Sequence, residues 1–263
     1  GLSQGYQDQH NDNRLYGKTF MSIDEDLIIK NKSYYTSGSL GFNYVFNDRH
    51  SVGATYEVNI NPYSRGGWNS LMDVWKNGSK TESYTNDMYC RFKSRPTQDI
   101  TAYYAGQIGK VSIEWNGEIY LRKTGQTQYS EETGMEGGDS RTIESDFTAD
   151  SWMHASKLVL SFPVWKGTLK VGNEFTESCR ANLYTIDEQG TDLPGKTDDQ
   201  VKESNLAAFV SYGLRLNKVE LNAGLRYEHV SSNYYNTGGD YWSEENKDYF
   251  VPNQSRKYDH FFP

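Results

Sequence analysis

Hydrophobic and polar residues alternate along residues 204–230 of the chain. In segments 206–216 and 219–228, mostly apolar side chains occupy every second position, and the residues between them are mixed or polar. Successive side chains of a β-strand point to opposite faces, so this pattern predicts two strands, joined by a turn at Asn217 and Lys218. Each predicted strand has the length and the two-faced pattern of a strand that crosses a bilayer within a β-barrel.

The same hairpin pattern occurs three more times along the chain, and sustained alternation is a strong strand signal. The four predicted hairpin units are approximately residues 34–61, 84–122, 152–177 and 204–230. Short turns lie inside the hairpins, and long polar segments at about 62–86, 123–151, 178–203 and 231–257 connect them. We therefore predict an all-β, antiparallel up-and-down meander of about 8–10 strands, forming a barrel or partial barrel. Short turns are expected at one end and long loops at the other.

No linker divides the sequence, so residues 1–263 are expected to form a single outer-membrane β-barrel section. Residues 1–30 are predicted to be irregular or to add a strand, residues 84–92 to extend the strand that follows them, and residues 231–263 to be a C-terminal loop. The sequence starts without an initiator methionine or a signal peptide, and we expect it to be part of a longer protein.

The composition is compatible with a membrane barrel, because only every second residue of a barrel strand faces lipid. The mean hydropathy is −0.83, and no apolar run is long enough for a transmembrane helix. The net charge of −8 argues against a nucleic-acid partner, which would select a basic surface. Cys90 and Cys179 are the two cysteines; an exported chain can pair them, and two unpaired thiols are the alternative.

One strand carries a motif that points to a known family. Residues 223–228 read AGLRYE, the strand before them contains AAFVSY, and the chain closes with FFP. Together with SLGFNY at residues 39–44, these segments resemble the TonB-dependent receptor-like outer-membrane β-barrel family that is common in Bacteroidetes. The resemblance covers roughly residues 33–263. The chain departs from a whole receptor because it shows no plug domain and far fewer strands than the 22 of such barrels.

The resemblance implies a section of a TonB-dependent outer-membrane receptor or transporter barrel that takes part in solute uptake. Its expected partners are the outer-membrane lipid, the plug domain and TonB complex of the parent protein, and an unidentified extracellular solute. The expected location is the bacterial outer membrane with the loops extracellular. Two alternatives stay open: a surface binding or adhesion barrel without transport, and a soluble β-sandwich that binds a ligand.

Charged residues on the polar faces of the predicted strands are the candidates for contact with a solute or a plug. These lumen-facing candidates are Glu114, Glu118, Arg122, Arg215, Arg226 and Glu228. Charges are ordinary on a face that meets water, so a purely structural role is the alternative. We expect Arg226 above all to hold an ion pair, either between strands or with a plug.

Two acidic runs are further candidates for cation sites, one in segment 131–150 and one in segment 187–199. Carboxylates can bind calcium, but the spacing of these residues does not match a calcium-binding loop. Solvated loops are the expected outcome, with no metal and no cofactor. No catalytic motif is present either, so the chain is not expected to be an enzyme.

Overall fold

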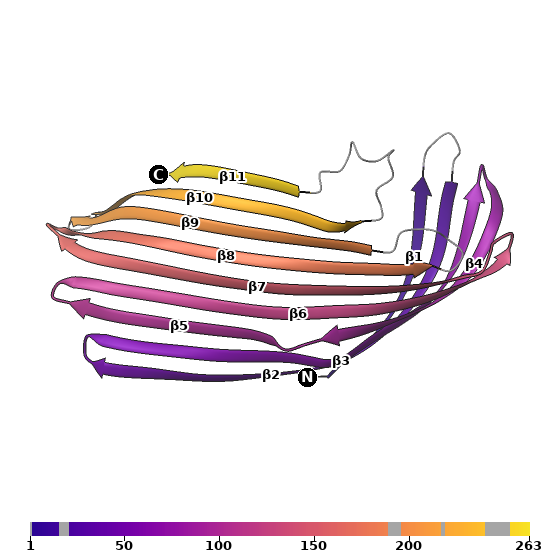
Figure 1. The fold of residues 1–263 in the computed structure, drawn as a ribbon, viewed down its shortest axis with the longest axis horizontal. Coiled ribbons are helices and arrows are strands. Elements are labelled where there is room, and N and C mark those ends of the chain that lie inside the picture. Colours follow the sequence, from indigo (N-terminus) through magenta and orange to yellow (C-terminus); the bar gives the residue numbers. More distant parts are fainter. Residues whose placement is uncertain (1, 16–20, 189–195, 217–218, 240–252) are drawn as a thin grey trace.

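The computed structural model describes residues 2–15, 21–188, 196–216, 219–239 and 253–263, and these residues form one antiparallel sheet (Figure 1). The sheet contains eleven strands: β1 (Leu2–Leu15), β2 (Met21–Asn47), β3 (His50–Lys76), β4 (Ser79–Ser94), β5 (Thr97–Ile108), β6 (Val111–Glu136), β7 (Arg141–Val164), β8 (Gly167–Glu188), β9 (Lys196–Leu216), β10 (Val219–Gly239) and β11 (Asn253–Phe262). Strands that follow one another in sequence lie side by side, so the predicted up-and-down meander is confirmed.

β4 and β5 together behave as one long strand with a break. Both strands lie between β3 and β6: β4 pairs with their distal halves and β5 with the halves next to the short turns. The break falls at Arg95 and Pro96, where proline has no N–H to give to the ladder. The Arg95 backbone N–H still donates to the Lys123 carbonyl across the break, at 3.3 Å. The prediction that residues 84–92 extend the following strand therefore holds, apart from this interruption.

The long polar connections are the part of the prediction that is wrong. Segments expected as loops continue as paired strands: β3 reaches Lys76 and β6 reaches Glu136. β7 starts at Arg141, and β2 and β3 contain 27 residues each. A strand outside a membrane needs no apolar face, because pairing with its neighbours satisfies its backbone N–H and C=O groups. Such a strand therefore shows no regular alternation in the sequence and is easily taken for a polar loop. At this end of the sheet, the connections that the structure describes are short, such as Asn77–Gly78 between β3 and β4.

Both ends of the chain contain paired strands, which was one of the two alternatives expected for residues 1–30 and differs from the loop expected for residues 231–263. β1 pairs along its whole length with the first half of β2, so residues 1–30 contribute strands. β11 pairs with β10 between Arg226 and Tyr235, inside the segment expected to be a C-terminal loop. The turns at Asp48–Arg49, Gly109–Lys110 and Trp165–Lys166 occur as predicted, whereas the turn predicted at Asn217 and Lys218 lies outside the described residues.

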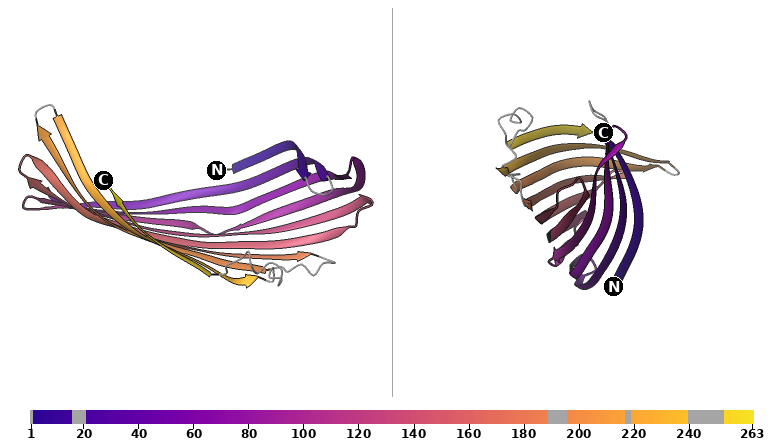
Figure 2. Two further views of the ribbon diagram at one scale, coloured as in Figure 1. Left: turned by 90° about the horizontal axis from the view of Figure 1, so that it is seen from above. Right: turned by 90° about the vertical axis from the view of Figure 1, so that its right-hand side faces the viewer.

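The sheet is curved, as the end-on view in Figure 2 shows, and its two faces differ. One face, here the apolar face, carries large exposed hydrophobic side chains such as Leu40, which is 77% exposed, with Phe42, Leu221 and Leu225. The opposite face, here the polar face, lines the hollows of the sheet. A β-sandwich buries its apolar faces between two packed sheets. Because the described strands form a single sheet with an open apolar face, the β-sandwich alternative is wrong.

The apolar face has the height of a bilayer core. On β9 it runs from Leu206 to Leu216, next to the short-turn end of the sheet. About ten residues at about 3.3 Å each, tilted by about 40°, rise roughly 25 Å, the height of the apolar band on outer-membrane barrels. No helix of the described residues is long and apolar enough to span a membrane. The remaining half of each long strand, here called the strand extension, stands beyond this apolar band.

Candidate functional site

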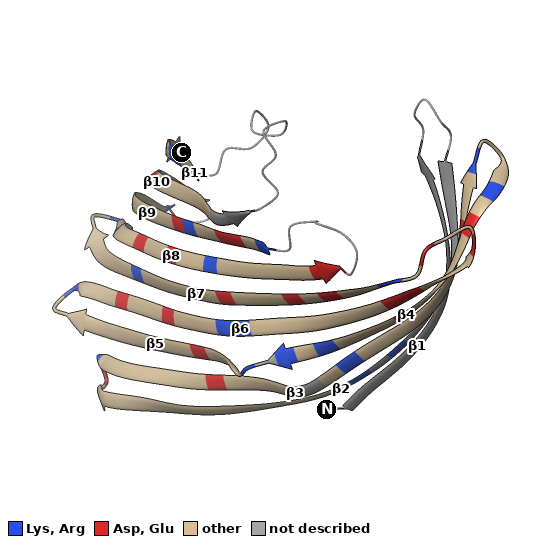
Figure 3. Ribbon diagram, turned by 45° about the vertical axis from the view of Figure 1, so that its right-hand side comes forward, with Lys and Arg blue, Asp and Glu red and all other residues tan. Residues whose placement is uncertain are grey.

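The structure places the six predicted lumen-facing residues on the polar face of the sheet. Figure 3 shows charged residues spaced along the strands. Glu114, Glu118 and Arg122 lie on β6, Arg215 on β9, and Arg226 with Glu228 on β10. Cross-strand register aligns these faces, since Arg226 lies opposite Phe209 and Glu228 opposite Ala207, while the apolar Leu225 lies opposite Val210. The six residues do not form one cluster, and only Arg226 and Glu228 lie together.

Arg226 is the centre of a charged network that crosses four strands. Its guanidinium donates to Glu174 of β8 at 2.6 Å and to Glu228 of its own strand at 2.5 Å. Glu174 also accepts from Lys157 of β7 at 2.5 Å. Two cations and two carboxylates thus alternate from β7 to β10, and this arrangement fulfils the expectation of an inter-strand ion pair at Arg226.

The network passes over β9, where the small Ala207 makes room for it and the ring of Phe209 contacts its cations. Ala207 lies between Glu174 and Glu228 in the register and is only 1% exposed, with a methyl side chain beneath the charged groups. Next to it, the ring of Phe209 lies 6.0 Å from the Arg226 guanidinium and 5.7 Å from the Lys157 ammonium. An aromatic face attracts cations at such distances. Phe209 therefore holds both cations toward Glu174.

The network borders a hollow on the polar face. The hollow has a volume of about 390 Å³ and is lined by residues of β5 to β8, among them Tyr103, Asn116, Glu118, Lys157 and Glu174. Glu118 makes no ion pair or side-chain hydrogen bond with the described residues. A free carboxylate, a tyrosine and an amide beside a balanced ion network give this wall hydrogen-bonding capacity toward a polar solute.

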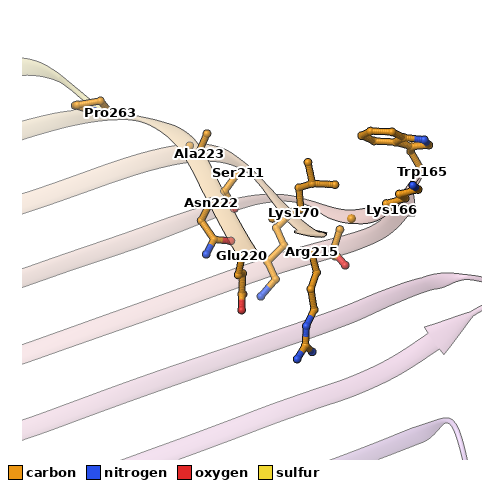
Figure 4. Close-up of a pocket in the computed structure, with 14 residues that line it drawn as sticks. Trp165, Lys166, Lys170, Ser211, Arg215, Glu220, Asn222, Ala223 and Pro263 are labelled. Atoms are coloured by element: carbon orange, nitrogen blue, oxygen red, sulfur yellow. The ribbon is translucent and has the colours of Figure 1, made fainter. Parts of the chain in front are cut away.

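A second hollow, of about 970 Å³, lies at the short-turn end of β8, β9 and β10 (Figure 4). It contains Arg215, the fourth of the predicted residues, together with Lys170 and Glu220. Arg122, another of the six, lines a hollow of about 590 Å³ near the break between β4 and β5. Glu114 is exposed on β6 and lines none of these hollows.

Most of the described residues of the acidic runs lie in strand extensions and not in solvated loops. Glu132 and Glu188 both accept from Arg141 at 2.5 Å, and Asp146 accepts from Lys93 at 2.9 Å and from Thr127 at 2.5 Å. Among the described residues, no group of three or more His, Cys, Asp or Glu side chains is arranged to hold a metal ion. Asp192, in the second run, lies outside the described residues.

Similar pairing stabilises the hairpin of β3 and β4. The hydroxyl of Ser83 donates to Asp73 at 2.7 Å, and the Lys80 ammonium lies 2.9 Å from the same carboxylate. These contacts lower the pKa of Asp73, the hydrogen bond from Ser83 first and the lysine second. The two cysteines are free: Cys90 on β4 and Cys179 on β8 are buried and unpaired, and burial raises the pKa of the Cys90 thiol.

A row of aromatic and charged side chains marks the distal border of the apolar face. The rings of Trp152 and His154 stack at 5.2 Å, and the ring of Phe175 lies tilted to that of His154 at 5.6 Å. Glu177 accepts from His154 at 3.1 Å and from Lys202 at 2.8 Å. Aromatic girdles with polar groups are typical of the membrane–water interface of β-barrels. This row therefore separates the membrane-spanning part from the strand extensions.

Sequence reasoning missed Lys157, Glu174 and Lys170, which the structure adds to the polar face. The signal was present: in β7 and β8 these residues alternate with the apolar Leu158, Leu160 and Val171. The sequence does not reveal the register of β8 with β7 and β9, and this register brings Glu174 between Lys157 and Arg226.

These features define the class of the protein. A curved antiparallel sheet, apolar on one face over the height of a bilayer and polar on the other, is part of the wall of a membrane β-barrel. Residues 106–263 match the outer membrane protein beta-barrel family, and the chain belongs to that family. It is therefore an outer-membrane protein in a lipid environment. No curated protein sequence matches the chain.

Solved structures give only distant likenesses. The outer membrane protease OmpT from Escherichia coli is 12% identical over 99% of this chain and 90% of its own, with a TM-score of 0.27. The ferric citrate transporter FecA is 7% identical over 99% of this chain, with a TM-score of 0.34, and the match spans 40% of the transporter. OmpT of Vibrio cholerae, as a loop-deletion mutant, is 9% identical over 90% of this chain and 94% of its own, with a TM-score of 0.19. Similarities of this size single out no particular relative.

Proposed function

We propose that the chain forms one arc of the wall of a solute-uptake receptor of the TonB-dependent type. The observation that carries this proposal is the division between the two faces at one height of the sheet. Lys157, Glu174 and Arg226 form a charged network on the polar face, while Leu158, Leu225 and their neighbours form the apolar face behind it. A polar inner wall with ion pairs and hollows suits the passage of a polar solute.

The open edges of the sheet support the proposal that this is an arc of a larger barrel. Residues 35–47 of β2 and 219–225 of β10 each pair on one side only, and β1 and β11 make no contact with each other. In lipid an unpaired strand edge is costly because water cannot satisfy its N–H and C=O groups. Further strands must therefore pair with these edges in the membrane.

The resemblance to TonB-dependent receptors supplies the rest of the proposed mechanism. In this scheme, the strand extensions are extracellular and capture the solute, a plug domain of the parent protein gates the lumen, and the TonB complex supplies the energy. The receptor-like family that the sequence resembles is common in Bacteroidetes, and we propose a parent bacterium of that group. The chain itself contributes the lumen wall, needs no cofactor and catalyses no reaction.

Uptake by the parent bacterium tests this proposal. The gene is deleted, and uptake of a panel of labelled solutes is measured with and without an uncoupler of the proton gradient. We expect uptake of at least one solute to depend on both the gene and the gradient. Complementation with the wild-type gene should restore uptake, and complementation with Glu174→Gln should restore it only in part.

The same strains separate transport from adhesion. If every solute enters the deletion strain at the wild-type rate while attachment of the cells to surfaces falls, the chain belongs to an adhesion barrel. The transport proposal is then overturned.

A further inference from the structure

The hollow at the short-turn end of β8, β9 and β10 has a composition that the charged network does not explain. Lys166, Lys170 and Arg215 line it together with a single carboxylate side chain, that of Glu220. The whole chain has a net charge of −8, so a local excess of cations stands out against it. Figure 4 shows Lys170, Arg215 and Glu220 extending to the same side of the sheet.

The cations of this hollow form no ion pair with the described residues. The side chains of Lys170 and Arg215 make no ion pair and no hydrogen bond with the described residues, and both are exposed. Arg215 lies directly opposite Glu220 in the register of β9 and β10, yet the two side chains form no ion pair. By contrast, Lys157 and Arg226, further along the same face, are both paired with carboxylates.

Neutral hydrogen-bond donors complete the lining. Ser211 lies opposite Lys170 in the register, and Asn222 lies opposite Gly213. A Cβ atom at Gly213 would lie 2.7 Å from the Asn222 amide oxygen, so the glycine makes room for that side chain to lie across β9. The hydroxyl of Ser211 and the amide of Asn222 have no side-chain partner among the described residues. Both therefore stay available to a ligand.

We propose that this hollow is an anion-binding site that takes phosphate or carboxylate groups. The guanidinium of Arg215 offers paired donors that match the oxygens of either group, and Lys170 adds a mobile positive charge. Ser211 and Asn222 would donate to the remaining oxygens. The anion belongs either to a solute or to an acidic protein segment inside the barrel at its short-turn end. The site concerns equilibrium binding and is independent of the proposed transport.

Calorimetric titration of the full chain in detergent, at low ionic strength, tests the proposal with two probes: inorganic pyrophosphate and an octapeptide of glutamate. We expect Lys170→Gln and Arg215→Gln each to weaken binding about tenfold, since each removes one charge-assisted interaction. Glu220→Gln should tighten binding, a gain that misfolding cannot produce. Lys123→Gln, which removes a cation already paired with Asp150 on another part of the sheet, is the matched control and should leave binding unchanged.

The pattern of results decides the matter. If the wild type binds pyrophosphate more tightly than the peptide, the site is assigned to a phosphate-bearing solute. If it binds the peptide more tightly, the site is assigned to an acidic segment. Both results support the site. Equal affinity of the wild type and a Lys170→Gln, Arg215→Gln double variant for both probes would overturn it. Unchanged uptake in the deletion strain would overturn the transport proposal but leaves this titration unaffected, so failures of the two proposals are distinguishable.

Discussion

At the scale of single residues, Arg226 reaches Glu174 across β9 because the residue opposite Glu174 on that strand is the small Ala207. We expect Ala207→Phe to destabilise the protein by about 1–3 kcal/mol, the usual cost of adding bulk to a filled position. Ala208, the next residue, points to the apolar face and is exposed, so Ala208→Phe should change stability little. Urea unfolding in detergent micelles measures both. Equal costs at the two positions would contradict the assignment of the faces.

Two arginines on the same face should differ in their contribution. Arg226→Gln leaves Glu174 and Glu228 without their shared cation, and we expect a loss of about 1–2 kcal/mol in the free energy of unfolding. Arg215→Gln removes a cation without a side-chain partner and should stay within about 0.5 kcal/mol of the wild type. The same unfolding experiment compares the two variants. A cost at Arg215 as large as that at Arg226 would be inconsistent with the network.

At the scale of elements, the hairpin of β3 and β4 should lose stability in acid. The pKa of Asp73 is lowered by Ser83 and Lys80, so the carboxylate stabilises the fold above its ordinary pKa and ceases to do so as the pH falls through the lowered value. We expect Asp73→Asn to cost about 1 kcal/mol at pH 7 and less at pH 2. Urea unfolding at the two pH values tests this. Asp48→Asn, in the exposed turn after β2, is the control, and a pH-independent cost at Asp73 would refute the explanation.

The two faces of one strand should respond oppositely to charge. Leu158 and Val159 are neighbours near the middle of the membrane-spanning part of β7, and Leu158 lies on the apolar face beside Trp115. Leu158→Arg should cost about 2–4 kcal/mol, as charges do at the middle of a bilayer. Val159→Arg places its charge beside Glu114 on the polar face and should be tolerated. Folding into lipid vesicles, followed by the heat-dependent shift of the band in electrophoresis, distinguishes the two.

Strands that cross the membrane were predictable because lipid imposes alternation on them, as in residues 206–216. The strand extensions were not, because outside the membrane no strict alternation of apolar and polar residues is imposed on them, and cross-strand pairing of backbone and side chains holds them. Pairs such as Arg141 with Glu188 depend on a register that no local pattern encodes. The same limit applies to the site. Arg226 was predicted from its motif, whereas the role of Glu174 is visible only in the register of β8 with its neighbours.

At the scale of the whole molecule, the account rests on an apolar face that meets lipid and a polar face that does not. A spin label is attached in turn to each position of residues 206–216 in bilayer vesicles, and its collision rates with oxygen and with a water-soluble nickel complex are measured. The account predicts a period of two: labels at Leu206, Ala208, Val210, Tyr212 and Leu214 collide mainly with oxygen in lipid, and those between them with the nickel complex. Equal accessibility on both faces would contradict the account.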